Sequence, residues 1–206
     1  MIAFLREHTD SSGRILFEDY GEVNLGLYDP FGGTNPSALL PLLAPGQYIG
    51  GPYMKTHLKT NFTQFGDGKL FERPVQTIDR ATFERYARLY NIRWIVLWSR
   101  PMFQLAVSHP DLFTPAAQFG FLHVYELTRA PNWAIVGTAD VLARPDQLEV
   151  TLAAPENDGT LVLSFHWVST LRSSVTLQPV LLDSDPVPFI GVRDAPQQFV
   201  IENRLW

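Results

Sequence analysis

A nearly unbroken apolar run constrains the fold of this chain more than any other feature of its sequence. Residues 92–98, IRWIVLW, are rich in β-branched and aromatic side chains, as is typical of a strand buried on both faces. Just before them, residues 79–90 place apolar side chains on one face at helical spacing, and Asp79 occupies an N-cap position. Asn91 fits the left-handed residue that ends many helices. A helix that leads directly into a doubly buried strand is half of a βαβ unit, so we expect an α/β layer here.

The flanking sequence predicts further elements of this layer. Residues 2–9 are expected to form a short helix, and residues 14–18, RILFE, a second buried strand. Residues 119–127, FGFLHVYEL, predict a third strand, whereas residues 111–117 are interpreted as a connection. Residues 20–71 are rich in Gly and Pro and leave two interpretations open. They form either a functional loop region or a set of short helices and turns that covers one sheet edge.

The pattern changes after residue 130 to short strands separated by turn residues. From Trp133 onwards, strands are expected at residues 147–152, 161–168, 175–182, 187–192 and 198–202. Several short alternating strands at this spacing are typical of a β-sandwich. The predicted fold class is therefore α/β (α+β). We expect an α/β subdomain with a short, mostly parallel sheet over residues 1–130, followed by an antiparallel β-sandwich-like subdomain over residues 131–206.

Composition and charge exclude several classes of function. Sixteen Lys and Arg residues against 21 Asp and Glu give a net charge of −5, and no basic block stands out, which argues against a nucleic-acid partner. The absence of cysteine excludes disulfides, thiol catalysis and cysteine-ligated zinc. No apolar run approaches the roughly 18 to 20 residues of a membrane span. The start, MIAFLREHTD, lacks the features of a signal peptide and enters a helix at once, so we expect a fragment of a longer protein.

Glu18 and Asp19 are the first candidate ligand-binding residues. They lie at the C-terminal end of a predicted strand, where open α/β sheets usually bind ligands. Adjacent residues of a strand point to opposite faces, so the two carboxylates are poorly placed as an acid/base pair. The favoured interpretation is a solvated or turn-capping pair. We assign no catalytic residue.

Aromatic and histidine side chains supply the remaining candidates. Tyr48, Tyr53 and Trp133 have rings that suit the C–H faces of sugars, and His57 and His166 complete the ligand-binding set. None of the five histidines has the close spacing of a metal-binding helix motif. Neither a phosphate loop, a dinucleotide fingerprint nor a GxSxG elbow is present. We therefore expect no metal site and no cofactor.

Five blocks of sequence, taken in order, resemble one known class of protein. They are residues 4–19, 48–74, 90–99, 119–127 and 161–174. Together they resemble the C-terminal soluble region of large multi-span bacterial and archaeal membrane proteins similar to YfhO and to dolichyl-phosphate-mannose-type (GT-C) glycosyltransferases. The blocks are patterns of fold rather than catalytic signatures. Residues 166–169, HWVS, depart from the Pro-Gly-Trp turn often seen in that class, so the resemblance assigns no role to Trp167.

The resemblance implies a location and a role. The chain would lie on the extracytoplasmic face of the cell membrane, with the membrane-embedded part of the same chain as its partner and a glycan or lipid-linked sugar as its ligand. In that class the bond-forming carboxylates are thought to lie in the membrane part. The domain itself would then be non-catalytic, and would bind or place the acceptor or act as a scaffold.

Two other functions remain open from the residues themselves. A free-standing carbohydrate-binding module would use the β-rich C-terminal half and its aromatic side chains, and it requires them to be exposed. A small independent enzyme would use Glu18 and Asp19 together with the Gly-rich segment 46–54 and a histidine, with His57 as the best placed.

Overall fold

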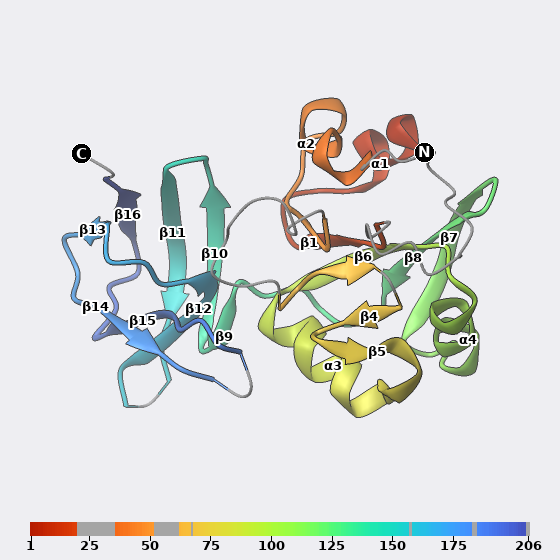
Figure 1. The fold of residues 1–206 in the computed structure, drawn as a ribbon. Helices are drawn as coiled ribbons and strands as arrows, with labels where there is room; N and C mark the ends of the chain where they lie inside the picture. Colours follow the sequence, from red (N-terminus) through yellow and green to blue (C-terminus); the bar gives the residue numbers. More distant parts are fainter. Residues whose placement is uncertain (20–35, 52–61, 67, 157, 183–184, 205–206) are drawn as a thin grey trace. The chain divides into compact units, whose positions relative to one another are not determined.

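The fold is mixed α/β, with few helices and many strands, as the sequence predicted (Figure 1). The computed structural model describes residues 1–19, 36–51, 62–66, 68–156, 158–182 and 185–204. The described chain forms two compact units, one of residues 1–87 and 92–130 and one of residues 88–91 and 131–206. None of the helices in the described part of the chain is long and apolar enough to cross a membrane.

The first unit is built on a five-stranded sheet with the order β2-β1-β6-β8-β7 (Figure 1). Its strands are β1 (Arg14–Phe17), β2 (Tyr48–Ile49), β6 (Ile92–Leu97), β7 (Phe113–Phe119) and β8 (Leu122–Leu127). Strand β1 pairs in parallel with β2 and with β6, whereas β8 runs antiparallel to β6 and to β7. The mostly parallel sheet that we expected is therefore a mixed sheet, in which the parallel pairs gather around β1.

Helices cover both faces of this sheet (Figure 1). On one face, α1 (Ile2–His8) and α2 (Leu40–Leu43) contribute Leu5 and Leu40 to a core shared with β1, β6 and β8. On the other face lies α3 (Arg80–Leu89), where the ring of Phe83 contacts Phe113, which contacts Tyr125 in turn. Helix α4 (Arg100–Ser108) follows β6 directly. The inner strands β1 and β6 are thereby buried almost along their whole length.

Smaller elements complete the first unit. Among the described residues they include the 3₁₀ turns η1 (Pro36–Ala38) and η3 (Val75–Thr77) and a three-stranded antiparallel sheet of β3 (Phe65–Gly66), β4 (Lys69–Leu70) and β5 (Arg73–Pro74). Within the described parts of residues 20–71, the chain therefore forms short helices, strands and turns.

The central helix and strand lie where the sequence predicted them. The Oδ1 atom of Asp79 accepts a hydrogen bond of 2.8 Å from the amide of Thr82, as an N-cap carboxylate does. Asn91 has a φ angle of 48° and is fully buried, so it is the left-handed stop between helix and strand. Strand β6 is buried along its length apart from Arg93, which is half-buried.

The interpretation of residues 111–117 as a connection is wrong, because strand β7 occupies most of them. Gly120 has a φ angle of 63° and turns the chain between β7 and β8. The single strand predicted for residues 119–127 is therefore the end of one strand, a tight turn and a second strand.

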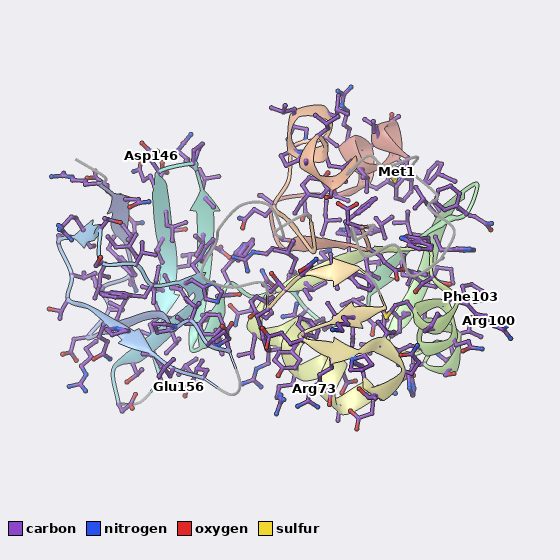
Figure 2. The ribbon with its side chains drawn as sticks, viewed as in Figure 1. Met1, Arg73, Arg100, Phe103, Asp146 and Glu156 are labelled. Carbon is purple, nitrogen blue, oxygen red and sulfur yellow. The ribbon has the colours of Figure 1, made fainter. Side chains whose placement is uncertain are left out.

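The second unit consists of two four-stranded antiparallel sheets, ordered β10-β11-β16-β13 and β14-β15-β12-β9. The strands are β9 (Ala134–Val136), β10 (Thr138–Ala143), β11 (Gln147–Ala154), β12 (Thr160–His166), β13 (Leu171–Ser173), β14 (Leu177–Val180), β15 (Phe189–Arg193) and β16 (Phe199–Asn203). Apolar side chains of both sheets form one core, to which Val150, Leu163 and Ile201 belong. Figure 2 shows Asp146 and Glu156 at opposite ends of this unit, where β11 begins and ends.

Candidate functional site

The parallel strands of the first unit bring three short segments to one edge of the sheet. Strands β1, β2 and β6 run in the same direction, so residues 18–19, 50–51 and 98–99 follow their carboxyl ends. This edge is where open α/β sheets usually hold their ligands. It is also where the sequence placed Glu18 and Asp19.

Glu18 binds the main chain in front of helix α4. Its Oε2 atom accepts hydrogen bonds from the backbone amides of Trp98, at 2.8 Å, and Ser99, at 2.9 Å. Its carbonyl oxygen accepts another from the indole Nε1 of Trp98, at 3.0 Å. Ser99 is the N-cap residue of α4, so the carboxylate lies near a helix N-terminus, where the helix dipole favours negative charge.

The environment of Glu18 shifts its acid–base equilibrium. The side chain is almost completely buried, and this burial raises the pKa of the carboxyl group above its ordinary value. The hydrogen bonds from Ser99 and Trp98 oppose the rise without cancelling it. Because both hydrogen bonds come from main-chain amides, the carboxyl group acts as an acceptor for the turn before α4.

Asp19 is buried as well and joins two other segments of the unit. The hydroxyl of Ser37 donates a hydrogen bond to its Oδ2 atom, and its amide donates one of 2.8 Å to the carbonyl of Phe65. A Cβ atom on Gly51 would lie 2.8 Å from the Oγ of the same Ser37, so a larger residue there would displace this hydroxyl. The interpretation of residues 18–19 as a solvated pair is wrong, and that of a turn-capping group holds for Glu18.

Of the three aromatic candidates, the structure describes Tyr48 and Trp133. Tyr48 is half-buried on β2, and its hydroxyl donates a hydrogen bond of 2.9 Å to the carbonyl of Ala44. Burial raises the pKa of Tyr48 to about 12. Trp133 belongs to the core of the second unit, where its ring stacks on Phe165 with the ring centroids 5.0 Å apart. Tyr53 and His57 lie outside the described residues.

His166 is part of a buried polar cluster in the second unit that the sequence did not reveal. Its Nε2 atom lies 2.9 Å from Oδ2 of Asp185, and the hydroxyl of Tyr90 donates a hydrogen bond to the same oxygen. The amide of Val187 donates to Oδ1 of Asp185 at 2.8 Å. The side chain of Asp185 is completely buried, whereas 28% of the His166 side chain is exposed.

The charge of Asp185 is stabilised by these donors. Burial by itself raises the pKa of the Asp185 carboxyl group, but the hydrogen bonds from His166, Tyr90 and Val187 outweigh that effect. The pKa of Asp185 is therefore lower than its ordinary value. In the sequence, Asp185 follows Asp183 in a stretch of mainly Pro and apolar residues, and no local pattern marks it as buried.

The described residues use their buried carboxylates as acceptors for amides and hydroxyls of the fold itself. Among these residues, no group of three or more His, Asp and Glu side chains is arranged to hold a metal ion. No protein-family model, curated protein or solved structure matches this chain.

Proposed function

We propose that this chain is a non-catalytic, extracytoplasmic domain of a membrane-bound glycosyltransferase-like protein, in which it binds or places a glycan. The ordered sequence blocks given above support the assignment to that class. One structural observation supports the non-catalytic role more than any other. The carboxylate of Glu18, at the sheet edge where open α/β folds usually hold ligands, is held by the amides of Trp98 and Ser99.

A carboxylate in this position has a capping role rather than a catalytic one. A general acid or base must reach the proton that it moves in the substrate, at hydrogen-bond distance. The Oε2 atom of Glu18 faces two main-chain amides instead, and removing it would leave both amides without their acceptor. The hypothesis of a small independent enzyme therefore loses Glu18 as its proton carrier.

The hypothesis of a free-standing carbohydrate-binding module is also weakened. It requires exposed aromatic rings in a row or groove. Trp133, one of the three rings on which it was based, is 4% exposed and packs in the core. The proposed role in glycan binding consequently uses polar groups of the chain rather than an aromatic platform built on Trp133.

Calorimetric titration of the 206-residue chain with neutral and uronate-containing oligosaccharides tests this proposal. We expect saturable binding of at least one glycan, and no hydrolysis of the glycan or of an activated sugar donor in the same samples. Hydrolysis that is lost in a folded Glu18→Gln variant would overturn the non-catalytic role. Failure of every glycan to bind would overturn the glycan-binding role.

A further inference from the structure

A surface pocket of about 410 Å³ lies on the second unit, at strands β13 and β16. Its lining residues are Arg172, Ser173, Ser174, Val200, Glu202 and Arg204. The alternation of the strands explains which side chains reach it. On β16, Phe199 and Ile201 point into the core, so Val200 and Glu202 point outward, and Arg172 pairs with Glu202 across the two strands. The pocket therefore lies on the outer face of the sheet.

The two arginines of this pocket differ in their partners. Arg204 forms an ion pair with Glu202, whose Oε2 lies 2.6 Å from Nη2 and 2.8 Å from Nε of the arginine. Arg172 donates only from Nη1, to the carbonyl oxygens of Ser169 and Leu171, both at 2.8 Å. Among the residues that the structure describes, no carboxylate is within ion-pair distance of Arg172. Two arginines and one glutamate leave the pocket with one positive charge in excess.

The hydrogen bonds of Arg172 pre-orient its guanidinium group. Because the two carbonyl oxygens hold Nη1, less side-chain freedom is lost when Nε and Nη2 bind a ligand. A guanidinium group presents paired N–H donors that match the two oxygens of a carboxylate or a phosphate. Ser174 adds a hydroxyl, and Val200, which is 37% exposed, adds an apolar contact. The volume also lies in the range of small-molecule sites, roughly 300 to 1,000 Å³.

We propose that this pocket binds a singly charged acidic group of a glycan, with Arg172 as the main anion-binding residue. The single excess positive charge matches a single negative charge, which a uronate carboxylate or a phosphodiester in a sugar polymer carries. Val200 would contact the C–H surface of the attached sugar. This inference rests on the proposed glycan-binding function and names the chemical class of the glycan.

Three probes separate the sources of the acidic group. They are trigalacturonate, a glycerol-phosphate trimer and neutral maltotriose, each titrated calorimetrically into the wild-type chain at low and at moderate salt. We expect one acidic probe to bind more tightly than maltotriose, with an affinity that falls as salt rises. Binding of trigalacturonate alone identifies a carboxylate ligand, and binding of the glycerol-phosphate trimer alone identifies a phosphodiester ligand.

A matched pair of variants tests the role of Arg172. Arg172→Ala is expected to weaken binding of the acidic probe about tenfold or more, because the hydrogen bonds between the guanidinium group and the acidic group are lost. Arg144→Ala is the control, since Arg144 directly follows strand β10 of the same sheet but is paired with Glu149 at 2.7 Å. We expect the Arg144→Ala variant to bind the acidic probe with an affinity close to that of the wild type. Arg172→Lys keeps the charge without the paired donors, and is expected to bind with intermediate affinity.

The outcomes distinguish this inference from the proposed function. Equal affinities for acidic and neutral probes, or acidic binding that survives Arg172→Ala, would overturn the acidic-group site while leaving glycan binding intact. Failure of all probes to bind would count against both. Arg172 is exposed, so its variants are expected to melt at the wild-type temperature, and circular dichroism checks that they are folded.

Discussion

The hydroxyl of Tyr90 donates a hydrogen bond to the carboxylate of Asp185, a residue 95 positions later in the sequence. Tyr90 follows the last turn of helix α3, and Asp185 lies between strands β14 and β15. Residues 88–91 belong to the second compact unit, to which Leu89 and Asn91 are also hydrogen-bonded. The hydrogen bond from Tyr90 gives the completely buried carboxylate one of the donors that it needs.

Asp185 is predicted to make the stability of the chain fall in acid. Its folded pKa is below the ordinary value of 3.8, so its stabilising contribution is present above that pH and is lost as the pH falls through the folded pKa. Asp185→Asn should lower the free energy of unfolding by about 1–3 kcal/mol at neutral pH and should flatten the acid decline. Chemical denaturation between pH 2 and pH 7 measures both effects.

The control for this experiment is Asp146→Asn, at the exposed turn between β10 and β11 (Figure 2). This variant is expected to follow the wild-type profile. If Asp185→Asn also followed the wild-type profile, the carboxylate would not be stabilised in its charged form.

Asn91 is predicted to tolerate glycine better than alanine. Its φ angle of 48° is unfavourable for alanine by about 1–2 kcal/mol, and its Oδ1 accepts a hydrogen bond of 2.9 Å from the amide of Asn132. Both variants lose the side-chain interactions of Asn91, including this hydrogen bond, and Asn91→Ala strains the backbone as well. Urea denaturation should rank wild type above Asn91→Gly and Asn91→Ala last. An Ala variant as stable as the Gly variant would refute the backbone argument.

Glu18 is predicted to stabilise the first unit most strongly at low pH. Because its folded pKa is above the ordinary value of 4.5, its contribution is fully present below that pH and decreases as the pH rises through the folded pKa. Glu18→Ala leaves two amides without an acceptor and should cost about 2–5 kcal/mol. Glu18→Gln should cost less, and its deficit relative to the wild type should shrink as the pH rises above 4.5.

The matched control for Glu18 is Glu7→Gln, on the exposed side of helix α1. Thermal unfolding of the three variants at several pH values gives the comparison. A deficit of Glu18→Gln that grows with pH would contradict the raised pKa.

Alanine substitutions at two glycines with positive φ angles distinguish the cost of steric conflict from that of backbone strain. A Cβ atom on Gly50, which has a φ angle of 98°, would lie 2.3 Å from the carbonyl oxygen of Phe17. A Cβ atom on Gly120, which has a φ angle of 63°, would meet nothing within 4 Å. Gly120→Ala should therefore cost only about 1–2 kcal/mol. Gly50→Ala should cost more than that and should reduce the yield of folded protein, and equal costs would contradict the packing around Gly50.

Local sequence patterns were sufficient to predict the central helix and strand. Residues 79–97 carry an N-cap, a helical apolar face, a left-handed stop and a β-rich apolar run, all within one short segment. Strand β7 was missed because it is an edge strand with mostly exposed side chains, and it contains Pro115 and an irregular register next to it. Its sequence therefore lacks the regular apolar pattern from which a buried strand is predicted.

The candidate site was predicted only in part, because its contacts join distant residues. The sequence placed Glu18 at the end of a strand, but its partner amide at Trp98 is 80 positions away, and only the folded sheet brings the two together. Likewise, nothing near His166 or Tyr90 in the sequence points to Asp185. Burial of a polar group depends on such long-range contacts, so single-sequence patterns favoured a solvated pair where the fold has a buried one.

The central claim, that this chain is one domain of a membrane glycosyltransferase-like protein, is tested most directly by the coding sequence upstream of Met1. We predict an open reading frame continuous with this chain that encodes several apolar segments of about 20 residues each, the length that spans a bilayer. An in-frame stop codon directly upstream, with translation starting at Met1 and no membrane-spanning segment in the gene, would contradict the claim.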